Sequence, residues 1–571
     1  MVNQNIKKYL LMIDLILLLV GLSIVIDSPA KSYELSIYSS TPISFWICTG
    51  AVIFLSLIIS LNHSSKKELF SALTIASISI ITIVSLPIIR NYCFFGMSDS
   101  ITHLGIVNNI LEGKINADTL FYPGIHLQSV FLSSLTGLPV RISLLMIIPI
   151  YAIIYLVFIV LFLRYQYGKF DNTLLVIGVY SAFLFLPINN NGIYFEPHPS
   201  SQAVLFFPVL IYLFLKYNNE KSIRLFAIFL VLFLGLLFIH PQHALSFILC
   251  ISAIIILSKG FSKKNSFTLR VPLIFTIIFW IWVTISSTFP SSLKNVFNRL
   301  IYGDLGLATG IIRRGMSLSL VGGNLVEIFF KMFFVTLLFG ILTLIYLYKF
   351  RKTKAIDKER VQNLFFGLIA ISLLFFVYII VLPGPGQAFR YLGVICVLLT
   401  VTGAYSLFCL IKNTNHKIKN VVIIAIFLVC LLLSISIYFD SPWNYNGNQQ
   451  ITQSDFDGYK TSFSFINNSL EFSSIRLESS RFYATIRGIN WTSISSKKFI
   501  SSPNHFDNHS LSKYYKHQTY LAITESELII DAQLYQGFRF SYNDFNYLKQ
   551  DNSIEKIQTN GGYNLFIINP V

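Results

Sequence analysis

Asp99 and His103 are the first residues of the chain whose types and spacing suit chemistry, and they lie in DSITHL directly after a long apolar run. If residues 99–112 form a helix, side chains four positions apart share one face. Asp99 could then serve as a general base, as a metal ligand or as the partner that orients His103. The alternative is helix capping, because Ser98 or Asp99 at the start of a helix needs no chemistry.

A further imidazole follows in the stretch YPGIH, which ends at His126. Proline and glycine at these positions favour a turn, and such a turn could fold His126 back toward Asp99 with Tyr122 beside it. The alternative is a plain turn proline next to an aromatic residue at a membrane interface.

A second acidic candidate lies in NNNGIYFEPHPSSQ, where Glu196 is the only acid and His198 follows two residues later. Carboxylates from two separate loops, Asp99 and Glu196, could share a divalent cation such as Mg²⁺ or Mn²⁺. They could equally divide acid and base roles between them. The alternative is a solvated loop with turn prolines.

Two more histidines occur in FIHPQHAL, where His240 and His243 are three residues apart and separated by Pro241. Such a pair could bind a metal or a phosphate. A polar cap at the end of a helix would explain the same residues.

Three arginines are candidates for binding an anion. Arg313 and Arg314 are adjacent in YGDLGLATGIIRRGMSLSLVGG, and Arg390 follows the Pro/Gly turn of LPGPGQAFRY. Guanidinium groups suit an anionic headgroup, although a general attraction to lipid phosphates would also explain the adjacent pair. Arg390 begins an apolar run and needs an anionic partner there, for which Asp304 and Glu327 are candidates.

The composition identifies the environment of these residues. Of the 571 residues, 54% are hydrophobic and 12% are charged, compared with about 25% charged in soluble domains. The chain is therefore predicted to be an integral membrane protein. Its net charge of +17 comes largely from Lys and Arg between apolar runs, as in membrane proteins generally, so nucleic-acid binding is not expected. The six cysteines form neither a CxxC metal pair nor a disulfide framework.

Hydropathy predicts thirteen membrane spans, each an apolar run near the length needed to cross the hydrocarbon. They lie near 9–27, 43–61, 68–90, 140–163, 172–188, 200–216, 223–239, 243–258, 271–288, 325–348, 362–382, 389–411 and 420–439. Segment 125–138 is too short and polar to cross and is predicted to be re-entrant or interfacial.

The loop charges predict an orientation for these spans. One set of alternate loops carries more than twice as many Lys and Arg residues as the other. Basic loops stay in the cytoplasm, so the N-terminus is predicted to be cytoplasmic. An odd number of spans then places the C-terminal tail outside the membrane, together with the loops that contain Asp99, Glu196 and His240.

The tail changes to a polar composition from Asp440 onward and is predicted to be an extracytoplasmic α/β domain. The chain thus divides into a transmembrane domain, 1–439, and a C-terminal domain, 440–571. Within the latter, residues 454–457 are typical of a helix start. RFYATIRG, residues 481–488, and KKFISS, 497–502, have strand composition. SIEKIQTNGGYNLFIINP predicts a hairpin that turns at 560–562.

An acid in the first large outer loop, followed by His, an amphipathic segment and YPGIH, resembles the GT-C superfamily of membrane glycosyltransferases. This group includes oligosaccharyltransferases and protein O-mannosyltransferases. Asp99 matches its loop-one acid, and Glu196-Pro-His198 lies where many members carry a second acidic motif. The many-span body with an outer C-terminal domain is similar to the oligosaccharyltransferase layout over most of the chain.

The resemblance implies a polytopic helical enzyme that uses a polyprenyl-phosphate-linked sugar donor. It implies that Asp99 activates an acceptor hydroxyl on a glycan, lipid or protein at the outer membrane face, with inversion. Other candidates would orient the reactants or hold a metal ion: His103, Glu196, His126, Tyr122, His198, His240 and His243. The donor phosphate would be held by Arg390, Arg313 and Arg314.

Some features depart from the oligosaccharyltransferases and leave other functions open. Their WWDYG-type motif is replaced by SPWNYN at 441–446, which favours transfer of a single sugar over transfer of a whole glycan to asparagine. A transporter or flippase for lipid-linked sugars would use the same arginines but need no base. An outer-leaflet glycan polymerase or ligase would rely mainly on arginines, and a scaffolding protein would need neither.

Overall fold

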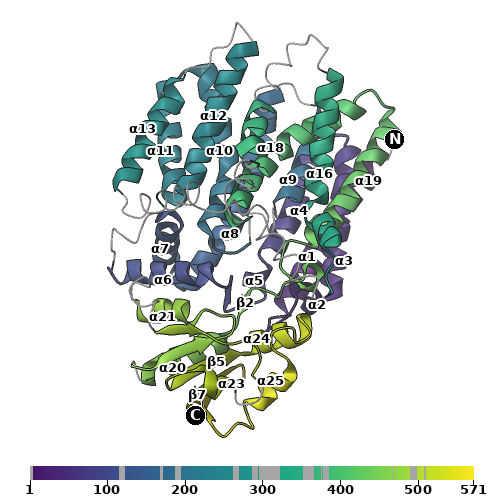
Figure 1. Ribbon diagram of the computed structural model, residues 1–571. Helices are drawn as coiled ribbons and strands as arrows, with labels where there is room; N and C mark the ends of the chain where they lie inside the picture. Colours follow the sequence, from purple (N-terminus) through teal and green to yellow (C-terminus); the bar gives the residue numbers. More distant parts are fainter. Residues whose placement is uncertain are drawn as a thin grey trace.

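The computed structural model of the chain describes residues 4–114, 122–167, 171–186, 195–261, 269–285, 294, 322–350, 365–374, 376, 385–466, 469–488, 498–506 and 510–570. Most of these residues form a bundle of long helices, and a smaller region that contains β-strands covers one end of the bundle (Figure 1).

Nine helices of the described ranges are long and apolar enough to cross a membrane, and each coincides with a predicted span. They belong to α1 (Gln4–Ile26), α3 (Ile43–Leu61), α4 (Lys66–Val84), α8 (Val140–Tyr167), α10 (Pro199–Glu220), α12 (Pro241–Phe261), α16 (Leu325–Phe350), α18 (Pro385–Ile411) and α19 (His416–Ile435). Helices satisfy their own backbone polar groups, as lipid requires. The chain is a multi-pass membrane protein.

The other four predicted spans coincide with apolar helices of 10–17 residues. They are α9 (Asn172–Phe185), α11 (Ile223–Ile239), α13 (Arg270–Ile285) and the helix Phe365–Leu374. A helix rises about 1.5 Å per residue, so the described parts of these four are short for a full crossing. The predicted count of thirteen spans is therefore not confirmed, although each predicted segment contains a helix.

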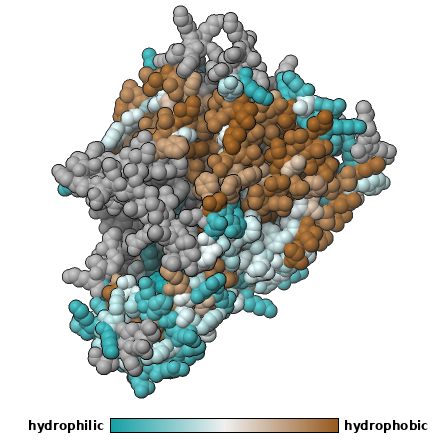
Figure 2. Space-filling view, turned by 45° about the vertical axis from the view of Figure 1, so that its right-hand side comes forward, coloured by the Kyte–Doolittle hydropathy of each residue, from teal (hydrophilic) through white to brown (hydrophobic). Residues whose placement is uncertain are grey.

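The bundle has a buried centre and an apolar exterior. In Tyr391–Ile411 of α18, 83% of the apolar window is buried inside the protein, whereas in Val326–Lys349 of α16 only 22% is buried. The exposed positions are also apolar, including Ile43, Leu344 and Leu432, each about two-thirds exposed or more. Figure 2 shows a broad hydrophobic surface over the bundle. A patch of this extent on a membrane protein faces lipid.

Each end of the bundle has its own polar contacts. At one end Lys7 donates to Ser64 over 2.6 Å, and Asn172 contacts His63 over 2.7 Å. At the other end the strands β1 (Phe94–Phe95) and β2 (Gln450–Ile451) pair and join the bundle to the C-terminal region. The N-terminus thus lies at the end remote from the C-terminal region (Figure 1).

Short helices lie between the bundle and the C-terminal region (Figure 1). They are α2 (Ile37–Ser40), α5 (Leu86–Ile89), α6 (Asp99–Leu111) and α7 (Gly124–Thr136). The segment predicted to be interfacial forms α7, which exposes Leu127, Phe131 and Leu135 along one side and buries His126 and Ser129 on the other. Such a helix suits the boundary between lipid and water.

The C-terminal region, residues 440–570, is a mixed α/β structure, as predicted. Its five-stranded sheet has the order β4-β3-β5-β7-β6, in which the first three strands are parallel and the last two antiparallel. The strands are β3 (Glu471–Ser474), β4 (Phe499–Ser501), β5 (Thr519–Thr524), β6 (Ile554–Thr559) and β7 (Tyr563–Ile568). The predicted hairpin at 560–562 joins β6 to β7, and the predicted strand at 497–502 contains β4.

Helices and helical turns make up the rest of the described C-terminal region. They are η1 (Pro442–Asn444), α20 (Gln453–Phe465), α21 (Ser479–Arg487), α23 (Ser510–Tyr514), α24 (Glu525–Ile529), η2 (Ile530–Leu534) and α25 (Tyr542–Tyr547). The predicted helix start at 454–457 lies in the first turn of α20, where Thr452 is the N-cap and accepts a hydrogen bond from the Asp455 amide.

The prediction of a strand over residues 481–488 was wrong, because this segment forms most of α21. Its aromatic and β-branched residues favour a strand locally, but tertiary packing overrides that preference. Phe482 stacks on Tyr459 with ring centroids 4.2 Å apart. Gly488 ends the helix with φ +64°, in the left-handed conformation typical of a helix C-terminus.

Candidate active site

Asp99 is the first residue of α6 and is placed there by an unusual backbone path. Gly96 has φ +110° and the N-cap residue Ser98 has φ +63°, both in the region that L residues rarely adopt. The Ser98 side chain makes no capping hydrogen bond. Helix α6 therefore begins without the usual side-chain cap. Its first turn lies beside Glu196 and His198.

Gly96 is required by this close approach. A Cβ atom at Gly96 would lie 2.5 Å from the Ser100 Oγ and 2.7 Å from the Glu196 Oε2. The turn and the Glu196 carboxyl are thus in direct contact, although 100 residues separate them in the sequence.

We expect Gly96→Ala to destabilise the protein, because it adds both backbone strain and a clash with Ser100. Unfavourable backbone conformations cost about 1–3 kcal/mol. Thermal unfolding in detergent measures this loss. Gly113→Ala is the matched control, because Gly113 also has positive φ, +71°, but has no atom within 4 Å of the added Cβ. Equal unfolding temperatures for the two variants would contradict the proposed crowding.

The Asp99 carboxylate lies between a guanidinium and an imidazole. Its Oδ1 accepts a hydrogen bond from the Arg481 Nη1 at 2.6 Å, and its Oδ2 lies 4.0 Å from the His198 Nε2. The Asp99 side chain is 60% exposed. A carboxylate that is held on one oxygen and accessible on the other can accept a proton from a bound molecule.

Glu196 provides a carboxyl group of different character. It lies against α6 and accepts a hydrogen bond from the Ser100 Oγ at 3.1 Å. Loss of hydration raises the pKa of Glu196 to about 8, and the Ser100 hydrogen bond only partly opposes this effect, while the nearby Asp440 and Asp99 carboxylates add to it. Glu196 is therefore protonated at neutral pH and can donate a hydrogen bond.

His103 and His126 form a buried imidazole pair. The His103 Nδ1 lies 3.0 Å from the His126 Nε2, and both side chains are at most 5% exposed. Burial lowers the pKa of His103 well below its usual value, and neighbouring positive charge adds to this effect. Burial likewise lowers the pKa of His126 to about 4. Both rings are neutral at pH 7, and one donates to the other. His126 thus contacts His103, whereas the predicted turn pointed it toward Asp99.

The remaining predicted histidines extend this cluster. The His103 ring lies 6.1 Å from that of His198 and 6.4 Å from that of Tyr122. On the other side of Tyr122, the His240 ring lies 5.6 Å away and is itself 4.9 Å from the His243 ring.

The starts of three helices hold this second half of the cluster together. The His243 Nε2 contacts the Ser200 Oγ at 2.7 Å, which joins α12 to α10. Gly124, at the start of α7, lies so close to α11 that a Cβ would approach the Ile239 amide nitrogen to 2.9 Å. Residues from four separate loops of the sequence therefore meet at one end of the bundle.

The predicted phosphate-binding arginines are not tested by this geometry. Arg313 and Arg314 lie outside the described residues, as does Asp304. Arg390 lies in the first turns of α18, but its side chain is outside the described part of the chain. Glu327, suggested as a partner of Arg390, forms an ion pair with Lys331 at 2.5 Å.

The predicted divalent cation at Asp99 and Glu196 stays a prediction. Asp99 is paired with Arg481, and the Glu196 carboxyl contacts Ser100. Within the described ranges no group of three or more His, Cys, Asp or Glu residues is arranged to hold a metal ion. The reaction proposed below is written with side chains of the protein alone.

Several residues of the site could not be identified from the sequence. Arg481 comes from α21, far along the chain from Asp99, and its segment has strand composition. Gly488 after Arg487 is a helix stop signal that favours a helix there. Ser100 and Ser200 carry no sequence signal, because their roles depend on contacts between distant segments.

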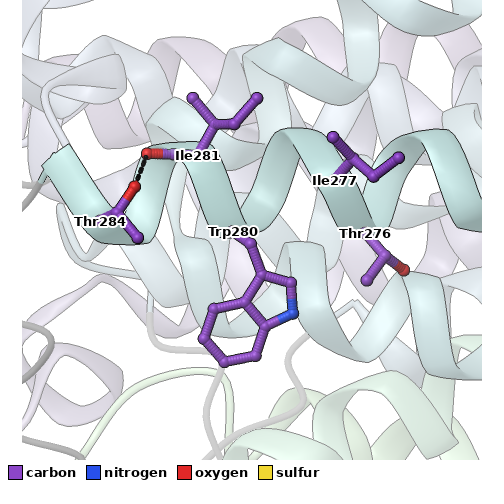
Figure 3. Close-up of a pocket in the computed structure, with 5 residues that line it drawn as sticks. All are labelled: Thr276, Ile277, Trp280, Ile281 and Thr284. Carbon is purple, nitrogen blue, oxygen red and sulfur yellow. Dashed lines mark hydrogen bonds between the residues drawn. The ribbon is translucent and has the colours of Figure 1, made fainter.

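A surface hollow away from this cluster lies along α13. Figure 3 shows that its lining side chains all project from this helix: Thr276, Ile277, Trp280, Ile281 and Thr284. Ile277, Trp280 and Ile281 are about half exposed, and the Thr284 hydroxyl is bonded to the Ile281 carbonyl oxygen at 2.8 Å. The hollow is apolar and suits contact with lipid rather than catalysis.

Comparison with solved structures identifies the fold. The structure of ArnT from Cupriavidus metallidurans bound to undecaprenyl phosphate superposes with a TM-score of 0.50 at 9% identity, covering 88% of this chain and 98% of ArnT. An oligosaccharyltransferase from Archaeoglobus fulgidus, in complex with Zn and sulfate, gives 0.46 at 13% identity, covering 83% and 70%. No protein-family model and no curated protein matches the sequence. The superposition on ArnT shows a shared fold and confirms the expected GT-C-like helical architecture.

Proposed function

We propose that the chain, which has the GT-C fold, is a membrane glycosyltransferase that moves a sugar from a polyprenyl-phosphate donor to an acceptor hydroxyl. The observation that carries this proposal is the position of Asp99. Its carboxylate is accessible, Arg481 fixes one of its oxygens, His198 lies 4.0 Å from the other, and Glu196 contacts Ser100, the next residue of α6. A fold alone does not determine function, and this cluster supplies the chemistry.

The reaction proposed is a single displacement. Asp99 accepts the proton of the acceptor hydroxyl as its oxygen forms a bond to the anomeric carbon of the sugar. The bond between that carbon and the phosphate oxygen breaks on the opposite side, and its electron pair leaves with the polyprenyl phosphate. One base and one displacement invert the configuration at the anomeric carbon.

The neutral groups around Asp99 would bind and orient the reactants. Protonated Glu196 is suited to donate a hydrogen bond to a sugar or phosphate oxygen. The neutral pair His103–His126 offers further donors and acceptors without net charge at neutral pH, and the rings of Tyr122 and His240 extend the cluster. We propose that Glu196 and His103 assist catalysis and that Tyr122, His126, His198, His240 and His243 support the site.

The donor is proposed to be held by its phosphate and its lipid chain. The ArnT structure, which shares the fold, contains undecaprenyl phosphate. In this chain Arg313, Arg314 and Arg390 are the proposed phosphate ligands. The exposed apolar surface of the bundle would contact the polyprenyl chain, as it contacts membrane lipids.

The proposed orientation places this site outside the cell. The loops at the end of the bundle with the N-terminus carry the larger share of Lys and Arg, so that end is cytoplasmic in the proposal. The site and the C-terminal domain, 440–571, then lie at the outer face, and the transmembrane domain is 1–439.

A donor series in vesicles tests the proposal. Purified protein is incorporated into vesicles with undecaprenyl phosphate carrying one of several labelled single sugars, and membrane extract supplies the acceptor. We expect label to leave the lipid and appear on an acceptor for at least one sugar. A label that crosses the bilayer while still attached to its lipid would instead indicate a flippase.

The same vesicles distinguish a polymerase or ligase that relies on arginines. Such an enzyme would lose transfer in Arg390→Ala and keep it in Asp99→Ala. Under the present proposal both variants lose transfer, Asp99→Ala because the base is removed.

A further inference from the structure

We infer that Arg481 of the C-terminal region is a positioning residue that fixes the Asp99 carboxylate for proton transfer. This inference rests on the proposed function and deepens it, because it makes the C-terminal region part of the active site. The first observation is the bond between the Arg481 Nη1 and the Asp99 Oδ1, at 2.6 Å, which joins two elements from opposite ends of the sequence.

Arg481 is itself held in place by its surroundings. The Nη1 that contacts Asp99 also donates to the Thr102 Oγ1 at 2.9 Å, so it spans the first turn of α6. On its other side the Arg481 Nε donates to Glu478, the N-cap residue of α21. The Arg481 side chain is only 13% exposed. A guanidinium with bonds in two directions presents a rigid fork to its carboxylate.

The helix that carries Arg481 is docked tightly on α6. The Thr485 Oγ1 donates to the Ile101 carbonyl oxygen at 2.8 Å. Gly105 of α6 leaves room for α21, because a Cβ atom at Gly105 would lie 3.0 Å from the Thr485 backbone. The Asn108 side chain donates to the Thr485 carbonyl oxygen at 3.4 Å. The position of Arg481 relative to Asp99 therefore follows from the docking of two helices and not from a flexible side chain alone.

The ion pair is poorly suited to act as a docking contact. Asp99 is 60% exposed, and ion pairs with one exposed partner contribute little to stability. The Thr485 and Gly105 contacts already hold the interface. The ion pair instead determines the orientation of the Asp99 carboxylate. Arg481 occupies the Asp99 Oδ1, and the Asp99 Oδ2 lies on the side of His198, 4.0 Å from its Nε2.

The consequence for the reaction is an oriented base. An exposed aspartate in the first turn of a helix otherwise samples several rotamers, and misplacement of a catalytic group by about 1 Å can cost about 100-fold in rate. With Oδ1 bound to Arg481, Oδ2 is the oxygen presented to an acceptor hydroxyl. The C-terminal region then controls turnover without contacting the polyprenyl chain.

The test measures kcat and KM for the undecaprenyl-phosphate sugar that the unchanged protein turns over best. We expect Arg481→Gln to lower kcat by about 100-fold with little change in donor KM. Arg481→Lys, which keeps a charge that can reach Asp99 but lacks the fork, is expected to recover part of this loss. In the Asp99→Asn background, Arg481→Gln should change kcat by less than about 3-fold, because the two residues act as one unit.

Arg141→Gln is the matched control. The Arg141 Nη1 donates to the Gln453 side chain at 3.0 Å and so crosses between the bundle and the C-terminal region without contacting Asp99. Its kcat should stay within about 3-fold of the unchanged protein. If Arg141→Gln, Arg481→Gln and Arg481→Lys all lose activity equally, the ion pair is a docking contact only and the inference fails.

Failure of this inference differs from failure of the proposed function. If the unchanged protein moves no sugar from any donor, the proposed function is wrong. If it does so and Arg481→Gln has a normal kcat, Asp99 needs no positioning by Arg481 and only the inference is wrong.

Discussion

Replacing Asp99 by asparagine should abolish sugar transfer while leaving the protein folded. Asparagine keeps the shape of the side chain and its hydrogen-bond acceptor, but its amide cannot take the proton of an acceptor hydroxyl. General-base catalysis contributes on the order of 10²–10⁴-fold to a rate, so kcat should fall by at least about 100-fold. Initial rates of label transfer at saturating donor measure this change.

The folding of this variant is checked by its unfolding temperature, which should stay close to that of the unchanged protein because Asp99 is 60% exposed. Asp457→Asn is the matched control. Asp457 is a carboxylate of α20 that accepts a hydrogen bond from the Gln453 side chain at 3.0 Å, outside the site. Near-normal turnover in Asp99→Asn would exclude Asp99 as the base.

Glu196 should make sugar transfer fall at alkaline pH. Its pKa is raised to about 8 by burial, so the neutral form proposed to donate a hydrogen bond is lost above that pH. The rate should fall roughly tenfold for each pH unit above the pKa. Glu196→Gln keeps a neutral hydrogen-bond donor and should remove this alkaline decrease, whereas Glu196→Ala should be slow at every pH. An unchanged pH profile in Glu196→Gln would show that another group titrates.

The same group should leave a signature in stability. The folded-state pKa of Glu196 lies above its usual value of 4.5, so the folded protein binds the proton more tightly than the unfolded chain. The free energy of unfolding therefore falls as pH rises between about 4.5 and 8, and levels off above this window. Glu196→Gln should lack this slope. Unfolding temperatures at several pH values compare the two proteins, and parallel curves would contradict the assigned pKa.

Much of the fold could be predicted because membrane helices are encoded locally. Each predicted apolar segment contains a helix, and the nine longest helices of the described ranges match predicted spans. The hairpin of β6 and β7 also follows from local turn chemistry at Asn560-Gly561-Gly562. Where the signal depended on packing, as in α21, local composition indicated the wrong element.

The sequence singled out several side chains that lie close together in the structure, but neither Arg481 nor the pairing of these side chains could be predicted. Polar side chains are costly near lipid, so Asp99, Glu196 and the histidines were conspicuous in an apolar chain. Their partners depend on the folded arrangement. His126 contacts His103. Asp99 contacts Arg481, which lies in a distant segment that no sequence motif links to Asp99. Hydrogen bonds between residues that are hundreds of positions apart leave no pattern in one sequence.

The configuration of the product at its anomeric carbon tests the single-displacement mechanism most directly. Label transferred from an undecaprenyl-phosphate sugar of known configuration is isolated with its acceptor and assigned by NMR coupling constants. A single base at Asp99 and a leaving phosphate on the opposite side predict the inverted configuration. A product with retained configuration would require a covalent sugar–enzyme intermediate and would contradict this mechanism.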